Sequence, residues 1–140
     1  MKKILIINGP NLNMLGKRDK NQYGSLTLKE INKLIKKSFP NTKFYFFQSN
    51  SESKIINKIH KIKNIDGLII NLGAFTHTSI AIRDALEIIN IPIVEVHLSN
   101  INEREDFRKI NYVKDIVIKS FYGEKEKSYL TGVKYLLDNI

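Results

Sequence analysis

The sequence predicts an α/β protein: a three-layer sandwich of flavodoxin-like order, in which helices cover both faces of a five-stranded parallel sheet. Short apolar runs rich in β-branched residues alternate along the chain with longer segments of helical periodicity. Several of the short runs are apolar on both faces, as is typical of buried parallel strands. The length of 140 residues and the hydrophobic content of 42% suit one domain, so we expect a single domain over residues 1–140.

The expected elements follow one another in a strict alternation. The strands are expected at residues 3–8, 43–48, 67–71, 92–97 and 115–119, and the helices at residues 27–39, 52–62, 79–89 and 125–137. The first helix opens with Thr27, and Glu30 follows three residues later, which is the pattern of a capping box. Right-handed crossovers between parallel strands then place helices on both faces of the sheet.

One connection in this alternation is unusually long. The polar, glycine-containing segment from Gly9 to Gly24 joins the first strand to the first helix. Connections in α/β units usually take about 2–6 residues, and longer ones are often active-site lids. We therefore expect an active-site lid over about residues 9–24.

Composition and charge limit the classes of partner. The net charge is +9, but the lysines are spread over the expected outer faces of the helices, so we expect steering of a small anionic substrate and no nucleic-acid partner. The chain has no cysteine, which excludes disulfides, thiolate metal sites and a cysteine nucleophile. The apolar run near the N-terminus is too short for a signal peptide, and no run approaches the roughly 18 apolar residues of a membrane span. We expect a cytoplasmic protein without a membrane partner.

Neutral hydrogen-bonding residues stand where the expected strands end. Asn8, Gln48, Asn71 and His97 each end a strand, and further amide and hydroxyl side chains follow them closely. Because ligands bind at the carboxyl ends of the strands in an open parallel sheet, these residues predict a site for a compact, hydroxylated substrate.

Motifs for phosphate and metal binding are missing. The glycines after the first strand lack the spacing of a phosphate-binding loop. Glu95 and His97 could share a metal, but a metal site usually needs three protein ligands, and the pair suits acid–base chemistry better. We expect neither a metal nor a cofactor.

The polar residues suit an elimination, which needs a base, a group that holds an enolate, and an acid for the departing hydroxyl. Tyr23 stands on the expected lid, five residues after Arg18, and a nearby cation can stabilise the anion of a phenol. Glu95, His97 and Ser99 alternate along a strand and therefore share one face. Taken alone, Tyr23 could equally be an ordinary loop aromatic.

Four ordered blocks of sequence resemble one known family. They are Asn8-Gly-Pro-Asn-Leu-Asn13 with Arg18 and Tyr23-Gly24, Gln48-Ser-Asn-Ser-Glu52, Asn71-Leu-Gly-Ala-Phe-Thr-His-Thr-Ser79 with Arg83-Asp84, and Glu95-Val-His-Leu-Ser-Asn100 with Arg104 and Arg108. Together they resemble the type II 3-dehydroquinate dehydratases, continuously over about the first four-fifths of the chain. The tail from Lys119 to Tyr129 departs from the family because it lacks most of the glycines usual there.

The resemblance implies a reaction and a set of roles. The family dehydrates 3-dehydroquinate to 3-dehydroshikimate in the shikimate pathway, by anti elimination through an enolate and without a cofactor, and assembles as a homododecamer, a tetramer of trimers. By the resemblance, Tyr23 is the base, Arg18 its activator and His97 the acid, while Asn11 holds a water on the enolate. Glu95 would hold the His97 ring. The implied substrate-binding residues are Asn71, His77, Asp84, Leu98, Ser99 and Arg108. His60 and Arg104 are interpreted as structural.

Two other classes of function remain open at this point. A flavodoxin-like binding or signalling module without catalysis would need an acidic phosphate-accepting cluster or flavin-binding loops, and the sequence has neither. A basic nucleic-acid-binding domain would show strongly salt-sensitive binding to DNA or RNA.

Overall fold

The computed structural model describes residues 1–140, and its centre is a parallel sheet of five strands in the order β2-β1-β3-β4-β5. The strands are β1 (Lys2–Asn8), β2 (Thr42–Gln48), β3 (Gly67–Asn71), β4 (Ile93–His97) and β5 (Lys119–Tyr122). This order is the flavodoxin-like one, so the predicted fold class is confirmed.

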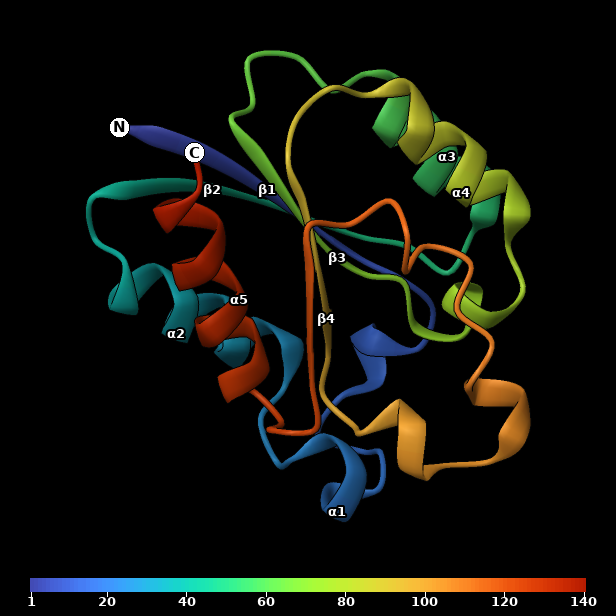
Figure 1. Ribbon diagram of the computed structural model, residues 1–140. Helices are drawn as coiled ribbons and strands as arrows, with labels where there is room; N and C mark the ends of the chain where they lie inside the picture. The colour runs from blue at the N-terminus through green and yellow to red at the C-terminus, as the bar shows by residue number, and fades with distance from the viewer.

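Helices cover both faces of the sheet (Figure 1). The long helices are α2 (Leu28–Ser38), α3 (Glu52–His60), α4 (Ile80–Ile88) and α5 (Lys127–Asp138). Helices α2 and α5 pack on one face, and α3 and α4 pack on the other. The four predicted helices are confirmed, and α2 begins with the predicted capping box between Thr27 and Glu30. None of the helices combines the length and the apolar character that crossing a membrane requires.

The alternation of side chains along the central strands divides the core into two clusters. Ile4 and Ile6 of β1 face the cluster beneath α2 and α5, whereas Leu5 and Ile7 face the cluster beneath α3 and α4. All four are essentially buried. Because burying an aliphatic side chain contributes about 1.5–3 kcal/mol, this doubly buried strand holds the helical layers on either side of it.

The last strand begins later than the sequence predicted. Residues 115–119 were expected to form it, but β5 spans Lys119–Tyr122. The apolar run before it instead packs Ile116 and Val117 against the core beneath α3 and α4. The shift has a consequence for the site, because it pairs Ser120 with Glu95 in the register between β5 and β4.

The expected lid contains regular structure of its own. It includes the 3-10 turn η1 (Leu12–Met14) and the short helix α1 (Lys20–Tyr23), whose N-cap Asp19 accepts a hydrogen bond from the backbone of Asn21. Leu12 and Leu15 are buried. The first half of the segment is therefore anchored in the core, and the exposed half carries α1.

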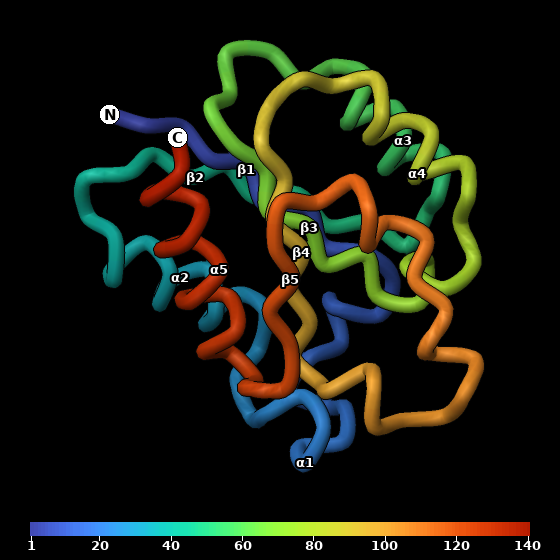
Figure 2. Tube along the Cα trace, viewed as in Figure 1, coloured from blue at the N-terminus to red at the C-terminus, as the bar shows by residue number.

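The carboxyl ends of the strands meet this lid and the chain that follows β4. Two 3-10 turns lie in that chain, η3 (Ile101–Glu103) and η4 (Asp106–Arg108), and a third, η2 (Gly73–His77), follows β3. Figure 2 shows α1 and the orange segment after β4 at the same end of the sheet. Close packing here requires glycine, because a Cβ on Gly9 would lie 2.3 Å from the carbonyl oxygen of Leu72.

Candidate active site

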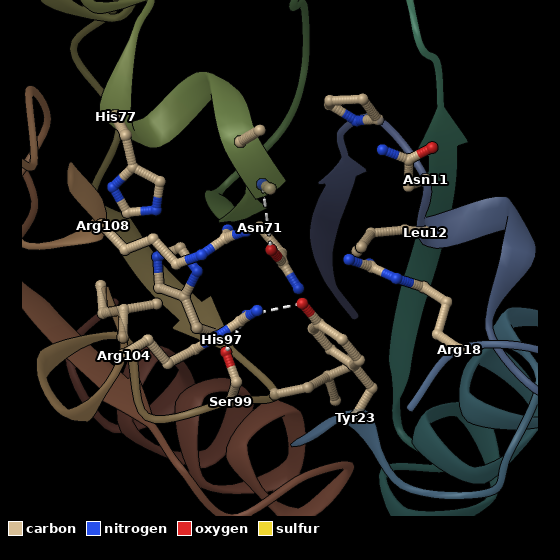
Figure 3. A pocket seen from close by; sticks show the side chains of 15 residues that line it. Asn11, Leu12, Arg18, Tyr23, Asn71, His77, His97, Ser99, Arg104 and Arg108 are labelled. Carbon is tan, nitrogen blue, oxygen red and sulfur yellow. Dashed lines mark hydrogen bonds between the residues drawn. The ribbon is translucent and has the colours of Figure 1, made fainter. Parts of the chain in front are cut away.

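A pocket opens at the carboxyl end of the sheet, between the lid and the segments that follow β3 and β4 (Figure 3). Its lining comprises Pro10, Asn11, Leu12, Arg18, Tyr23, Asn71, Gly73, Ala74, His77, His97, Leu98, Ser99, Ile101, Arg104 and Arg108. The structure thus brings together all the site residues expected from the sequence except Glu95 and Asp84. It also adds Arg104.

Two arginines flank Tyr23, and they contact different parts of it. Arg104 donates a hydrogen bond from Nη1 to the phenol oxygen of Tyr23 at 2.5 Å (Figure 3). The guanidinium carbon of Arg18 lies 3.8 Å from the centre of the Tyr23 ring, over its face. The interpretation of Arg104 as structural is therefore wrong: its side chain lines the pocket and touches the expected base. Arg104 stands nearest to the oxygen on which a phenolate carries its charge.

The pocket lining is strongly positive. Arg18, Arg104 and Arg108 contribute three guanidinium groups, and no aspartate or glutamate lines the pocket with them. Glu105, beside the pocket, accepts a hydrogen bond from Arg108 Nε at 2.7 Å. Burial, together with the charges of Arg104 and Arg108, lowers the pKa of Arg18 although Tyr23 opposes the shift. Because a guanidinium stays protonated, the three charges repel one another and favour an anionic ligand between them.

His97 and Glu95 form a buried pair at the end of β4. His97 Nε2 lies 2.8 Å from Glu95 Oε2. Burial raises the pKa of the Glu95 carboxyl, but hydrogen bonds from His97, Ser120 and Asn111 outweigh it, and the net shift is downward. Glu95 therefore stays ionised and accepts the Nε2–H of His97, which leaves His97 Nδ1 without a protein partner.

His77 faces the same pocket from η2. Its Nδ1 lies 2.6 Å from the carbonyl oxygen of Ile110, and its ring stacks at 6.5 Å from that of His97. Burial lowers the pKa of His77, and the charges of His97 and Arg108 add to this effect. A neutral His77 donates from Nδ1 to Ile110 and leaves Nε2 as an acceptor for a ligand hydroxyl.

A buried tyrosine from α5 supports the floor of the pocket. The Tyr129 hydroxyl accepts a hydrogen bond from Asn71 Nδ2 at 2.9 Å and donates to the side-chain oxygen of Asn8. Asn71 Oδ1 accepts from the backbone N–H of Gly73, so both ends of its amide are fixed. Burial raises the pKa of Tyr129, which therefore remains a neutral phenol. No spacing in the sequence pointed to this residue.

Replacing Tyr129 by Phe tests this support. The substitution leaves the Asn8 oxygen and one Asn71 N–H buried without a partner, and each unsatisfied group costs about 1–3 kcal/mol. We expect the free energy of unfolding, measured by urea denaturation, to fall by at least about 1 kcal/mol. An unchanged unfolding midpoint would contradict the role of Tyr129. Tyr45→Phe, at an exposed phenol, is the matched control.

Asn11 lies near the start of the expected lid and has a backbone in the left-handed region, with φ of 69°. Its backbone N–H donates to the side-chain oxygen of Asn50 at 3.0 Å, while Gln48 Nε2 donates to the carbonyl oxygen of Gly9 at 3.1 Å. Asparagine tolerates this backbone conformation better than most residues. The side-chain amide of Asn11 has no protein partner and can hold a water molecule in the pocket.

Asp84 does not reach the pocket of its own chain. His77 and Asp84 were expected on similar faces because seven residues separate them, but His77 ends a 3-10 turn and Asp84 lies on α4. The backbone leaves helical geometry at Ser79, the N-cap of α4, so the two side chains do not share a face. Asp84 is exposed on the outer surface.

Comparison with known proteins decides the family. The sequence profile described as Dehydroquinase class II matches residues 2–137. The chain belongs to the class II dehydroquinase family. It is 47% identical to a 3-dehydroquinate dehydratase of Clostridium botulinum (strain Okra / Type B1), over 100% of this chain and 97% of that one. It is 54% identical to a 3-dehydroquinate dehydratase of Buchnera aphidicola subsp. Cinara cedri, over 96% of this chain and 94% of that one.

A solved structure agrees with this membership of the class II dehydroquinase family. The type II dehydroquinase from Butyrivibrio crossotus superposes with a TM-score of 0.93 at 42% identity, and the match covers 97% of each chain.

Proposed function

We propose that this class II dehydroquinase removes water from 3-dehydroquinate to give 3-dehydroshikimate, by anti elimination through an enolate, within the shikimate pathway. The observation that carries the proposal is a pocket in which a phenol with two arginines and a histidine with a buried carboxylate face the same space. The family to which the chain belongs supports it.

The first step is the loss of a proton beside the ketone. The Tyr23 oxygen takes one proton from the methylene group that lies between the ketone and the hydroxyl-bearing carbon. Arg104 donates to that oxygen, and Arg18 lies over the ring, so both cations stabilise the phenolate that acts as base. A water molecule held by the Asn11 amide donates to the enolate oxygen that forms.

The second step expels the hydroxyl. The electron pair of the enolate forms the new carbon–carbon double bond as the carbon–oxygen bond breaks, and His97 protonates the departing hydroxyl from Nδ1. Glu95 fixes the ring and stabilises its protonated form. Tyr23 then releases its proton to water and His97 takes one up from water, which restores the phenolate and the protonated ring of the starting state.

The remaining polar groups bind the substrate. Arg108 presents a guanidinium that can hold the substrate carboxylate in a fork. Asn71, His77, and Ser99 with the backbone after Leu98 line the same pocket and can bind the ring hydroxyls. Every one of these roles uses a protein side chain or backbone group, so the proposed reaction needs neither a metal nor a cofactor.

The resemblance supports a cytoplasmic homododecamer built as a tetramer of trimers. Ile80 and Ile88 on α4, and Phe107 and Ile110 after β4, are exposed apolar side chains that an assembly would cover. Asp84 lies on the same helix and outside its own pocket, so a role in binding substrate requires a neighbouring copy of the chain. Sedimentation should give a mass twelve times that of the 16.2 kDa chain.

An assay of the purified protein with 3-dehydroquinate tests the reaction, because the conjugated enone of the product absorbs in the ultraviolet. We expect turnover that a metal chelator leaves unchanged. We also expect that borohydride, added with substrate, attaches no mass to the protein, because no lysine lines the pocket to form a Schiff base. Loss of turnover with the chelator, restored by zinc, or a covalent adduct with borohydride would overturn the mechanism.

A further inference from the structure

The Glu95 carboxylate is held by two donors that lie outside the pocket. Asn111 Nδ2 lies 3.0 Å from Glu95 Oε1 and 2.9 Å from Oε2, and Ser120 Oγ donates to Oε1 at 2.7 Å. With His97, these two residues supply all the side-chain donors to a carboxylate that is 1% exposed. A buried charge with so little solvent depends on such donors to stay ionised.

Each donor is fixed in place by contacts of its own. Ser120 stands directly opposite Glu95 in the register of β5 on β4, so its hydroxyl shares a sheet face with the carboxylate. Asn111 Oδ1 accepts from the backbone N–H of Val113 at 2.9 Å, which leaves the Nδ2 end of the amide to face Glu95. The next residue is anchored too, because the backbone N–H of Tyr112 donates to the carbonyl oxygen of Thr76.

Neither Asn111 nor Ser120 lines the pocket, and the side-chain donors of both are directed at Glu95. Asn111 Nδ2 and Ser120 Oγ both donate to Glu95, and Glu95 Oε2 in turn contacts His97 Nε2. The ring of His97 is therefore oriented by a carboxylate that would rotate or take up a proton without its two donors. A misaligned His97 ring would still lie in the pocket wall, but its Nδ1 would no longer point at the departing hydroxyl.

We propose that Asn111 and Ser120 are positioning residues for the dehydration: they fix the orientation and the charge of Glu95, and thereby aim the His97 ring at the departing hydroxyl. The inference rests on the proposed function of His97 as the acid. The late start of β5 matters for this role, because a strand confined to residues 115–119 would leave Ser120 unpaired with Glu95.

Single substitutions test the inference by their effects on kcat and KM. We expect Ser120→Ala and Asn111→Ala each to lower kcat about 10- to 100-fold, the range for losing one hydrogen bond to a charged group. KM should stay within about threefold of the unaltered enzyme, because the binding groups are untouched. Ser120→Thr keeps the hydroxyl on a strand that suits threonine, and should restore kcat.

Ser79→Ala is the matched control, because Ser79 is also a serine whose hydroxyl donates to a glutamate, in this case Glu52, away from the pocket. It also caps α4, so its loss should lower the urea midpoint of unfolding while leaving kcat unchanged. A fall in kcat for Ser79→Ala equal to that for Ser120→Ala would overturn the inference, since general destabilisation would then explain both.

The decisive comparison repeats the substitutions in a His97→Ala enzyme. Residues that act only through His97 should cause no further fall in the residual kcat there. An equal fall in both backgrounds would overturn the positioning role. If Asn111→Ala does not fold, Ser120→Ala alone completes this comparison. Failure of the proposed function is a separate result, because the unaltered protein would then not dehydrate 3-dehydroquinate at all.

Discussion

Tyr23→Phe is expected to abolish turnover of 3-dehydroquinate while the substrate still binds. The substitution removes only the oxygen that is proposed to take the proton, and a positioned base contributes about 10²–10⁴-fold or more when no other group replaces it. The cation that binds the substrate carboxylate stays in place, because Arg108 lies on the opposite side of the pocket from Arg18 of the expected lid (Figure 3). Turnover is measured by enone absorbance and binding by calorimetry.

Ordinary turnover in a folded Tyr23→Phe enzyme would exclude Tyr23 as the base. Conservative changes at the two arginines then separate their roles. Lysine keeps the positive charge but loses the rigid fork of the guanidinium. Because Arg104 contacts the phenol oxygen, Arg104→Lys should move the rise of activity to higher pH, with partial recovery in alkaline buffer. If Arg18→Lys lowers activity at every pH without changing the shape of the pH profile, then Arg18 acts by binding the substrate and does not activate Tyr23.

His97→Ala is expected to lower kcat by about 10²–10⁴-fold, because hydroxide is a poor leaving group without a positioned acid. The change also takes a donor from buried Glu95, so unfolding must be measured alongside activity. His97→Asn keeps an amide donor near Glu95 but cannot deliver a proton. Both variants should therefore lose turnover, whereas the asparagine variant should keep more of the stability.

His60→Ala is the internal control for this experiment. His60 ends α3, is exposed, and takes no part in the pocket. It should retain near-normal turnover. Near-normal turnover in a folded His97→Asn enzyme would show that His97 binds the substrate and is not the acid. A loss of turnover in His60→Ala as large as that in His97→Ala would show that the effect is not specific to the pocket.

The regular elements were predictable because their signals are local. The capping box at Thr27 and the two-sided apolar run of β1 each lie within one short window of sequence. The strand β5 was misplaced for the same reason: the apolar run at residues 116–118 looks like a strand, but Ile116 and Val117 pack against the core beneath α3 and α4. The true strand contains Lys119 and Ser120, and only its pairing with β4 reveals it.

The site was predictable where its residues stand at the ends of strands or in the recognised blocks. His97, Asn71 and the lid residues fall in the pocket, because parallel strands bring their carboxyl ends to one edge. Arg104 was missed because its role depends on a hydrogen bond to Tyr23, which lies 81 residues away in the sequence. The expectation that His77 and Asp84 share a face was wrong because sequence spacing alone does not show the break in the backbone at Ser79.

The most direct test of the mechanism uses 3-dehydroquinate with deuterium at one of the two methylene positions beside the ketone. In the proposed mechanism, a base and an acid act on opposite faces of the substrate ring. It therefore predicts that deuterium placed anti to the departing hydroxyl is lost, and that deuterium placed syn is retained in the 3-dehydroshikimate detected by mass spectrometry. Loss of the syn deuterium, or formation of no product, would contradict it.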